Sequence, residues 1–169
     1  MRQQILLTAL FLTTFILGVQ AQQSSQNATL TVQINQAISL TLTDVNPTLV
    51  FDEASDFVNG VTTTAANAGE VTATRAYSLS VQAATSVIDD GSGNSIPVNS
   101  VTVTPTATSG GNASATTLST TDTDIITAAP AGVALPFGLA YSTQPNDASF
   151  TNVPNGNYTV QLTYTATLD

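Results

Sequence analysis

The sequence contains no cysteine, lysine, histidine or tryptophan, and its one methionine is the first residue. A catalytic site in this chain would therefore lack an imidazole base, a thiol nucleophile and an amine, and a zinc site would lack its usual nitrogen and sulfur ligands. The absence of cysteine also excludes disulfides, so the core alone has to stabilise the fold. We expect a chain that is not an enzyme and that holds no cofactor.

Residues 1–21 have the parts of a secretory signal peptide. Arg2 supplies the positive charge, residues 5–17 are apolar apart from threonine, and Val19-Gln20-Ala21 offers small residues for cleavage after Ala21. The apolar run is shorter than the roughly 20 residues that a bilayer core requires, so we expect no membrane span in the mature chain. No cysteine for lipid attachment follows it. The sequence predicts a secreted protein, extracellular or on the cell surface, with the periplasm as the alternative.

Negative charge dominates the chain. Eleven Asp and Glu residues face two arginines, which gives a formal net charge of −9. Removal of residues 1–21 takes Arg2 away and leaves the eleven acids against Arg75 alone, a net charge of −10. Such a domain is repelled by phosphate backbones and anionic lipids, which excludes nucleic acid as a partner.

Apolar residues alternate with threonine, serine and glutamine in several places, which is the period of half-buried strands. No window of eleven residues after the signal peptide shows helical periodicity. The threonines are β-branched and suit a pleated surface that faces water. The pattern predicts an all-β protein with strands over residues 28–34, 38–42, 77–81, 101–104 and 158–168.

Turn-forming residues separate these strands. Asn59-Gly60, Asn67-Ala68-Gly69, 89–95 and Pro154-Asn155-Gly156 combine residues that accept a positive φ or begin a bend, and 109–124 reads as a long loop or an edge strand. This spacing predicts one Ig-like antiparallel β-sandwich of about seven to nine strands. We expect it to cover residues 28–169, after a flexible tail over 22–27.

The order of these landmarks carries a resemblance. They are Ala28–Ile34, Ile38–Leu42, Leu49–Phe51, Asp56–Val61, Arg75–Val81, Ile96–Val101 and Gly156–Tyr164. In this order the chain resembles small secreted bacterial β-sandwich domains of unassigned function, and it is similar in layout to spore-coat-like and pilin-like sandwiches that end in a tyrosine-rich strand. The resemblance covers nearly all of the chain after the signal peptide. It implies a pilin-like sandwich and a surface, adhesive or polymer-forming module rather than a chemistry.

One loop offers ligands for a hard cation. Asp89, Asp90 and Asn94 place oxygen atoms around Gly91 and Gly93, which suits Ca²⁺. The loop lacks the spacing and the closing glutamate of an EF-hand, so a solvated hairpin turn is the favoured interpretation. Calcium stays open as the alternative.

Two further groups of charged residues have a structural and a functional interpretation. Asp52, Glu53 and Asp56 could pair as acid and base on a glycoside, but aromatic platforms for a sugar are not dense here and a polar strand end is favoured. Arg75 is expected to form a modest ion pair with Glu70, with contact to an anionic ligand as the alternative.

The sequence therefore favours a non-enzymatic extracellular structural or adhesive subunit. We expect self-association, or association with other surface proteins, through strand edges or faces. Leu30, Val32 and Ile34 form the best candidate for a strand exchanged between subunits, because three alternating apolar residues follow directly on the tail. The alternative is a carbohydrate- or calcium-dependent binding module.

Overall fold

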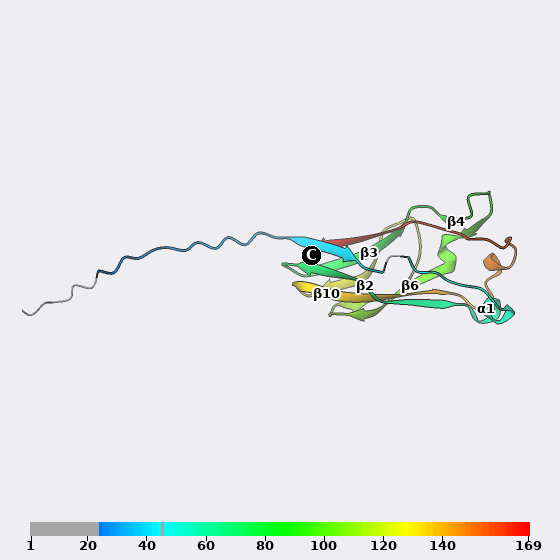
Figure 1. Ribbon diagram of the computed structural model, residues 1–169, viewed down its shortest axis with the longest axis horizontal. Coiled ribbons are helices and arrows are strands. Elements are labelled where there is room, and N and C mark those ends of the chain that lie inside the picture. The colour runs from blue at the N-terminus through cyan, green and yellow to red at the C-terminus, as the bar shows by residue number, and fades with distance from the viewer. Residues whose placement is uncertain (1–23, 45) are drawn as a thin grey trace, which may run out of the picture. The chain divides into compact units, whose positions relative to one another are not determined.

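The computed structural model describes residues 24–44 and 46–169 (Figure 1). The predicted signal peptide, residues 1–21, and the start of the predicted tail lie outside the described residues. The chain divides into two units, Met1–Gln33 and Ile34–Asp169. The second unit contains every strand and helix in the described part of the chain.

The elements of this domain are short and almost all β. Its helical elements are α1 (Ala54–Asn59), η1 (Val98–Ser100) and η2 (Ala148–Phe150). Its strands are β1 (Ile38–Leu42), β2 (Thr62–Ala73), β3 (Tyr77–Ala83), β4 (Val87–Asp89), β5 (Ser95–Pro97), β6 (Val101–Thr108), β7 (Asn112–Ala113), β8 (Thr116–Thr117), β9 (Thr123–Ala129), β10 (Gly132–Thr143) and β11 (Leu162–Leu168).

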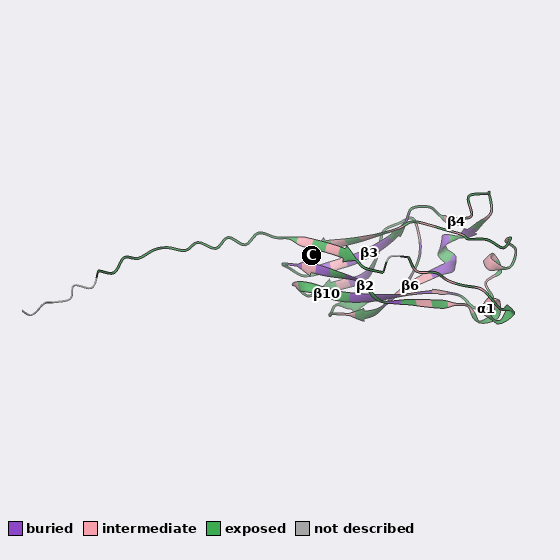
Figure 2. Ribbon diagram, in the orientation of Figure 1, coloured by how far each residue is buried: buried purple, intermediate pink, exposed green. Residues whose placement is uncertain are grey.

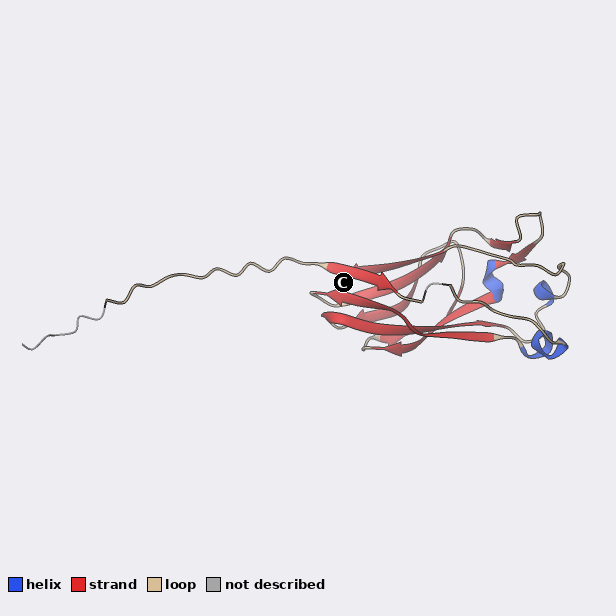
Figure 3. Cartoon of the chain, viewed as in Figure 1, coloured by secondary structure: helices blue, strands red, loops and turns tan. Residues whose placement is uncertain are grey.

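Two antiparallel sheets form a sandwich, which confirms the predicted fold class (Figure 3). We call the five-stranded sheet, with the order β1-β2-β10-β6-β8, sheet A, and the four-stranded sheet, with the order β11-β3-β9-β7, sheet B. Together they hold nine strands, within the predicted range. A separate hairpin, β4-β5, lies toward the same end of the domain as α1 and η2.

The core lies between the two sheets and follows the alternation of the sequence (Figure 2). In β3 the residues Tyr77, Leu79 and Val81 are buried, and in β10 Phe137, Leu139 and Tyr141 are buried opposite them in the core cluster. Burial of one such side chain contributes about 1.5–3 kcal/mol to the free energy of unfolding, which makes this cluster the main source of stability in a chain without disulfides.

The structure corrects three of the predicted elements. Residues 28–34 belong to no strand, and the turn predicted at Asn67-Ala68-Gly69 lies inside the continuous strand β2. The last strand begins at Leu162 rather than at Tyr158, although Thr159 forms an isolated bridge with Asp89. The segment 109–124 was predicted to be a long loop or an edge strand. It holds the two-residue strands β7 and β8, in agreement with that prediction.

Candidate functional site

The most unusual feature of the described chain is a row of exposed apolar side chains ahead of β1. Leu30, Val32 and Ile34 are 87%, 73% and 82% exposed. They occupy alternate positions, so an extended chain would place all three on one side. Residues 22–43 contain no charged residue, although the protein as a whole is strongly acidic.

The register of sheet A explains why this row is not buried by its own domain. Ile38, the first residue of β1, is paired with Ala73, the last residue of β2. The backbone N–H of Thr74 donates to the carbonyl of Ala37, and the N–H of Ala37 donates to the Thr74 hydroxyl at 2.9 Å. The ladder therefore ends at Ala37, and β2 has no further residues opposite the row.

The sandwich has four sheet edges, and they differ in length. Strands β8 and β7, at one side of sheets A and B, have two residues each, and such short edges are poor templates for another strand. At the other side β1 has five residues and β11 has seven, and neither contains a charged residue or a proline. Because natural edge strands are usually protected by charge, proline or shortness, β1 and β11 are the two exposed templates.

The core is also least covered along these two long edges. Neither β1 nor β11 has a fully buried residue, in contrast to β2, β3, β6, β9 and β10. In β11 the inward side chains of Leu162, Tyr164, Ala166 and Leu168 stay half-buried against the core, and Ile38 and Leu40 of β1 do the same. Apolar surface therefore stays in contact with water at this side of the sandwich.

A pair of tyrosines ties β11 to the opposite sheet. The hydroxyls of Tyr141 in β10 and Tyr164 in β11 share a hydrogen bond of 2.6 Å. Burial raises the pKa of both phenols above 10.0, the ordinary value for tyrosine. The hydrogen bond holds β11, the last strand of sheet B, against sheet A.

The predicted calcium ligands Asp89, Asp90 and Asn94 are brought together in the β4-β5 loop, but by hydrogen bonds within the loop. Asp90 Oδ1 accepts from the N–H groups of Ser92 at 2.8 Å and Asn94 at 3.1 Å, and Asp90 Oδ2 accepts from Asn94 Nδ2 at 2.7 Å. The Asn94 side chain is the main reason why the pKa of Asp90 is lowered. This arrangement fits the hairpin-turn interpretation, and the calcium alternative stays a prediction.

The carboxylates near Phe51 serve the start of α1. Asp56 Oδ2 accepts from the backbone N–H groups of Asp52 at 2.8 Å and Glu53 at 2.9 Å. These two donors fix the turn that leads into the helix, and the ring of Phe57 then packs 5.0 Å from that of Phe51. The Asp56 carboxylate therefore has a local structural role at this end of the domain, and Asp52 takes part through its backbone.

The structure places Glu70 and Arg75, the predicted ion pair, on the two sides of the end of β2. Glu70 lies in β2, opposite Thr41 of β1 on one side and Pro136 of β10 on the other. Arg75 lies in the turn that follows the end of β2 at Ala73. Both side chains are exposed. The ion pair itself stays a prediction.

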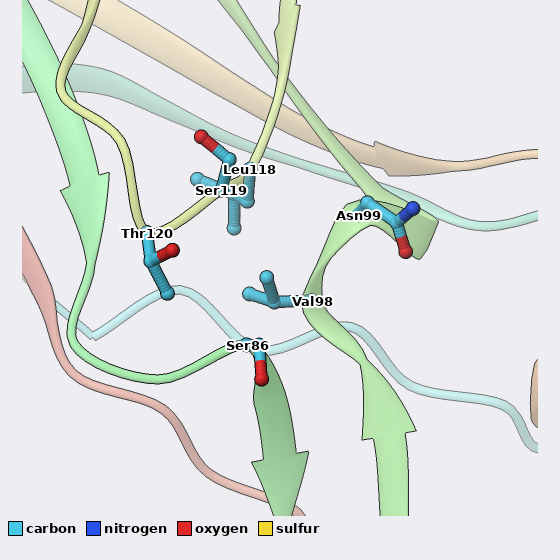
Figure 4. Close-up of a pocket in the computed structure, with 6 residues that line it drawn as sticks. All are labelled: Ser86, Val98, Asn99, Leu118, Ser119 and Thr120. Atoms are coloured by element: carbon cyan, nitrogen blue, oxygen red, sulfur yellow. The ribbon is translucent and has the colours of Figure 1, made fainter.

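One shallow cavity of about 250 Å³ lies beside the crossing between β8 and β9 (Figure 4). Its apolar side chains are Val98 and Leu118, and its polar ones belong to Ser86, Asn99, Ser119 and Thr120. None of the six side chains is an acid or a base at ordinary pH, so they offer no general acid or general base.

Within residues 24–44 and 46–169, no group of three or more His, Cys, Asp or Glu side chains is placed to hold a metal ion. In the same described part, no helix is long and apolar enough to cross a membrane.

No protein-family model matches the chain, and no curated protein is significantly similar to it. Two separate features stand out: the exposed row Leu30, Val32 and Ile34, and the two long edges β1 and β11 of the sandwich.

Proposed function

We propose that the chain is a non-enzymatic, secreted structural or adhesive subunit that associates with copies of itself, or with other surface proteins, through strand edges, and donates its N-terminal segment to a neighbour. The observation that carries this proposal is the exposure of Leu30, Val32 and Ile34, at 87%, 73% and 82%, ahead of a sandwich with two unprotected long edges.

The energetics favour such an association. Full burial of three aliphatic side chains would contribute about 5–9 kcal/mol before the cost of ordering the segment, and an added strand also gains backbone hydrogen bonds. The donated segment and both edges are uncharged, so the net negative charge of the subunits is not concentrated at the contact.

Negative-stain electron microscopy and light scattering of the purified exported chain test the proposal. We expect filaments or large assemblies from the wild type, and monomers from the variant Leu30→Ser/Val32→Ser/Ile34→Ser. Val133→Ser is the matched control, because Val133 is also 80% exposed but lies in β10, and this variant should assemble like the wild type.

The proposal is wrong if the wild type stays monomeric at high concentration. It is equally wrong if the triple serine variant assembles as the wild type does. Circular dichroism of the triple variant should show the same β spectrum as the wild type, because the three side chains contribute little to the core.

A further inference from the structure

If the proposed function holds, the acceptor strand is β1 or β11. The two strands differ in length, and their sheets differ in the number of strands. β11 offers seven residues, which equals the length of the segment Ala28–Ile34, whereas β1 offers five. Sheet B has four strands and sheet A has five, so an added strand beside β11 makes the two sheets equal. Both observations favour β11.

The apolar faces of the donor and of β11 also match. Leu162, Tyr164, Ala166 and Leu168 point toward the core and stay half-buried, while Thr163, Thr165 and Thr167 are exposed. A segment beside β11 with Leu30, Val32 and Ile34 on the inner face would extend this apolar row and leave Thr29, Thr31 and Gln33 outward. Residues directly opposite each other on neighbouring strands point to the same face of the sheet. Even-numbered donor residues therefore have to lie opposite even-numbered residues of β11.

The direction of β11 decides how two subunits are related. Leu168 is paired with Tyr77, and Asp169 donates to the carbonyl of Ala76, so β11 ends near the turn that follows Ala73, where β1 begins. We call this end of the domain the β1 end. An antiparallel donor on β11 would have Ala28 nearest the β1 end of the acceptor and Ile34 nearest the opposite end.

The direction of the donated strand also fixes where the sandwich domain of the donating subunit lies. Ile38 follows four residues after Ile34, so their Cα atoms lie at most about 14 Å apart, and the β1 end of the donor faces the opposite end of the acceptor. This contact is head-to-tail and leaves the β11 edge of the donating subunit free for a third copy. Repetition of the contact generates an open filament. An antiparallel donor on β1 would run the other way, bring two β1 ends together and close a two-fold dimer.

We propose that the outer edge of β11 accepts the segment Ala28–Ile34 of a second copy as an antiparallel fifth strand of sheet B, so that the assembly is an open head-to-tail filament and not a closed dimer.

Cysteine cross-linking can test this edge directly, because the chain contains no cysteine of its own. Thr31→Cys is combined in the exported chain with Thr163→Cys or with Thr165→Cys, both outward positions on β11. A disulfide needs Cα atoms about 4.4–6.8 Å apart, so only directly opposed positions should react under mild oxidation. We expect one of these two pairs to give a ladder of covalent oligomers on a denaturing gel.

Two further pairs are the controls. Thr31→Cys with Ala166→Cys places the second thiol on the inner face of β11 and should give no ladder. Thr31→Cys with Ser39→Cys tests the edge of β1, and a product limited to dimers with this pair would overturn the assignment to β11 while the donated segment itself still stands.

Failure of this inference differs from failure of the proposed function. If no pair cross-links but the wild type assembles and the triple serine variant does not, the acceptor is not β11. If no pair cross-links and the wild type is monomeric, the proposed function has failed as well.

Discussion

Two alanines near the β9-β10 turn adopt a backbone conformation that costs free energy. Ala128 has φ 52° and Ala134 has φ 49°, in the left-handed region that favours glycine. A non-glycine residue there costs about 1–2 kcal/mol. The sheet register shifts on both sides of this turn, between Tyr77 and Leu79 in one pair and between Gly132 and Leu135 in the other, and these bulges impose the conformation.

Ala128→Gly should therefore stabilise the domain. The exposed methyl group of Ala128 loses no packing, and relief of the left-handed strain exceeds the entropy that glycine adds to the unfolded chain, for a net gain of about 0.5–1 kcal/mol in the free energy of unfolding. Urea denaturation measures the change. Ala107→Gly, at an exposed position of β6 without a positive φ, is the control and should lose a similar amount. Destabilisation by both changes would contradict the strain argument.

The hydrogen bond between Tyr141 and Tyr164 should make stability fall in alkaline solution. Burial raises the pKa of both phenols above 10.0, so the folded state favours the neutral form. Below pH 10 the phenols are neutral in both states and their contribution is complete. Above pH 10 the unfolded chain ionises first, and the free energy of unfolding decreases as the pH rises.

Urea denaturation at about pH 8 and about pH 11 checks this dependence. Tyr141→Phe/Tyr164→Phe should flatten it, and the remaining slope should come from other tyrosines such as Tyr77, whose pKa burial also raises. At neutral pH each single Phe variant should lose about 1 kcal/mol, and the double variant less than the sum, because neither phenol is left without its partner. A slope unchanged in the double variant would contradict this role.

Among the elements, β2 and β10 depend on a close approach at Gly69. A Cβ on this residue would lie 2.9 Å from the ring of Phe137 and closer still to the carbonyl oxygen of Thr41. Gly69 therefore lets β1, β2 and β10 keep their register around Phe137, the largest fully buried side chain of the core.

Gly69→Ala should destabilise the domain by about 1–3 kcal/mol, because the ring and the β1 backbone have to move apart. Thermal and urea denaturation give the size of the loss. Gly156→Ala is the matched control, since its Cβ would meet only the ring of Tyr158 at 3.8 Å, and it should change stability by less than about 0.5 kcal/mol. Equal effects of the two changes would show that the close approach is not limiting.

The strands β2 and β10 also illustrate which elements the sequence predicts and which it misses. Alternation of apolar and polar residues correctly predicts β1, β3 and β6 and most of β11. It misses β2 and β10, because Asn67-Ala68-Gly69 resembles a turn and Pro136 and Gly138 interrupt the pattern. In the structure these small residues mark bulges and close contacts between strands, which a reading of one strand at a time does not reveal.

The sequence predicted one part of the candidate site, the apolar row, but not the strand edges. The row Leu30, Val32 and Ile34 was found by its period, but the period predicts a strand without saying which chain it pairs with. That distinction needs the register, which ends sheet A at Ala37 and Thr74. The open edge of β11 was not predictable either, because its sequence looks the same at the edge of a sheet as in the middle.

At the scale of the whole molecule, charge and assembly oppose one another. If residues 1–21 are removed, as the sequence predicts, eleven acids face Arg75 alone, and the subunits of the proposed assembly would repel one another. The segment Ala28–Ile34, β1 and β11 carry no charge. Added salt therefore screens the repulsion between the bodies of the subunits and leaves the contact itself almost unaffected.

Assembly should accordingly become faster and more complete as the salt concentration rises. Between about 0.01 M and about 0.15 M NaCl the screening length falls from about 30 Å to about 8 Å, which weakens the repulsion between exposed charges. Light scattering of the exported chain at the two concentrations measures the effect, and the variant Leu30→Ser/Val32→Ser/Ile34→Ser should show no rise at either. If salt instead dissolves the assemblies, ion pairs hold the subunits together, and the contact would have to include Arg75, the one cationic side chain left if residues 1–21 are removed.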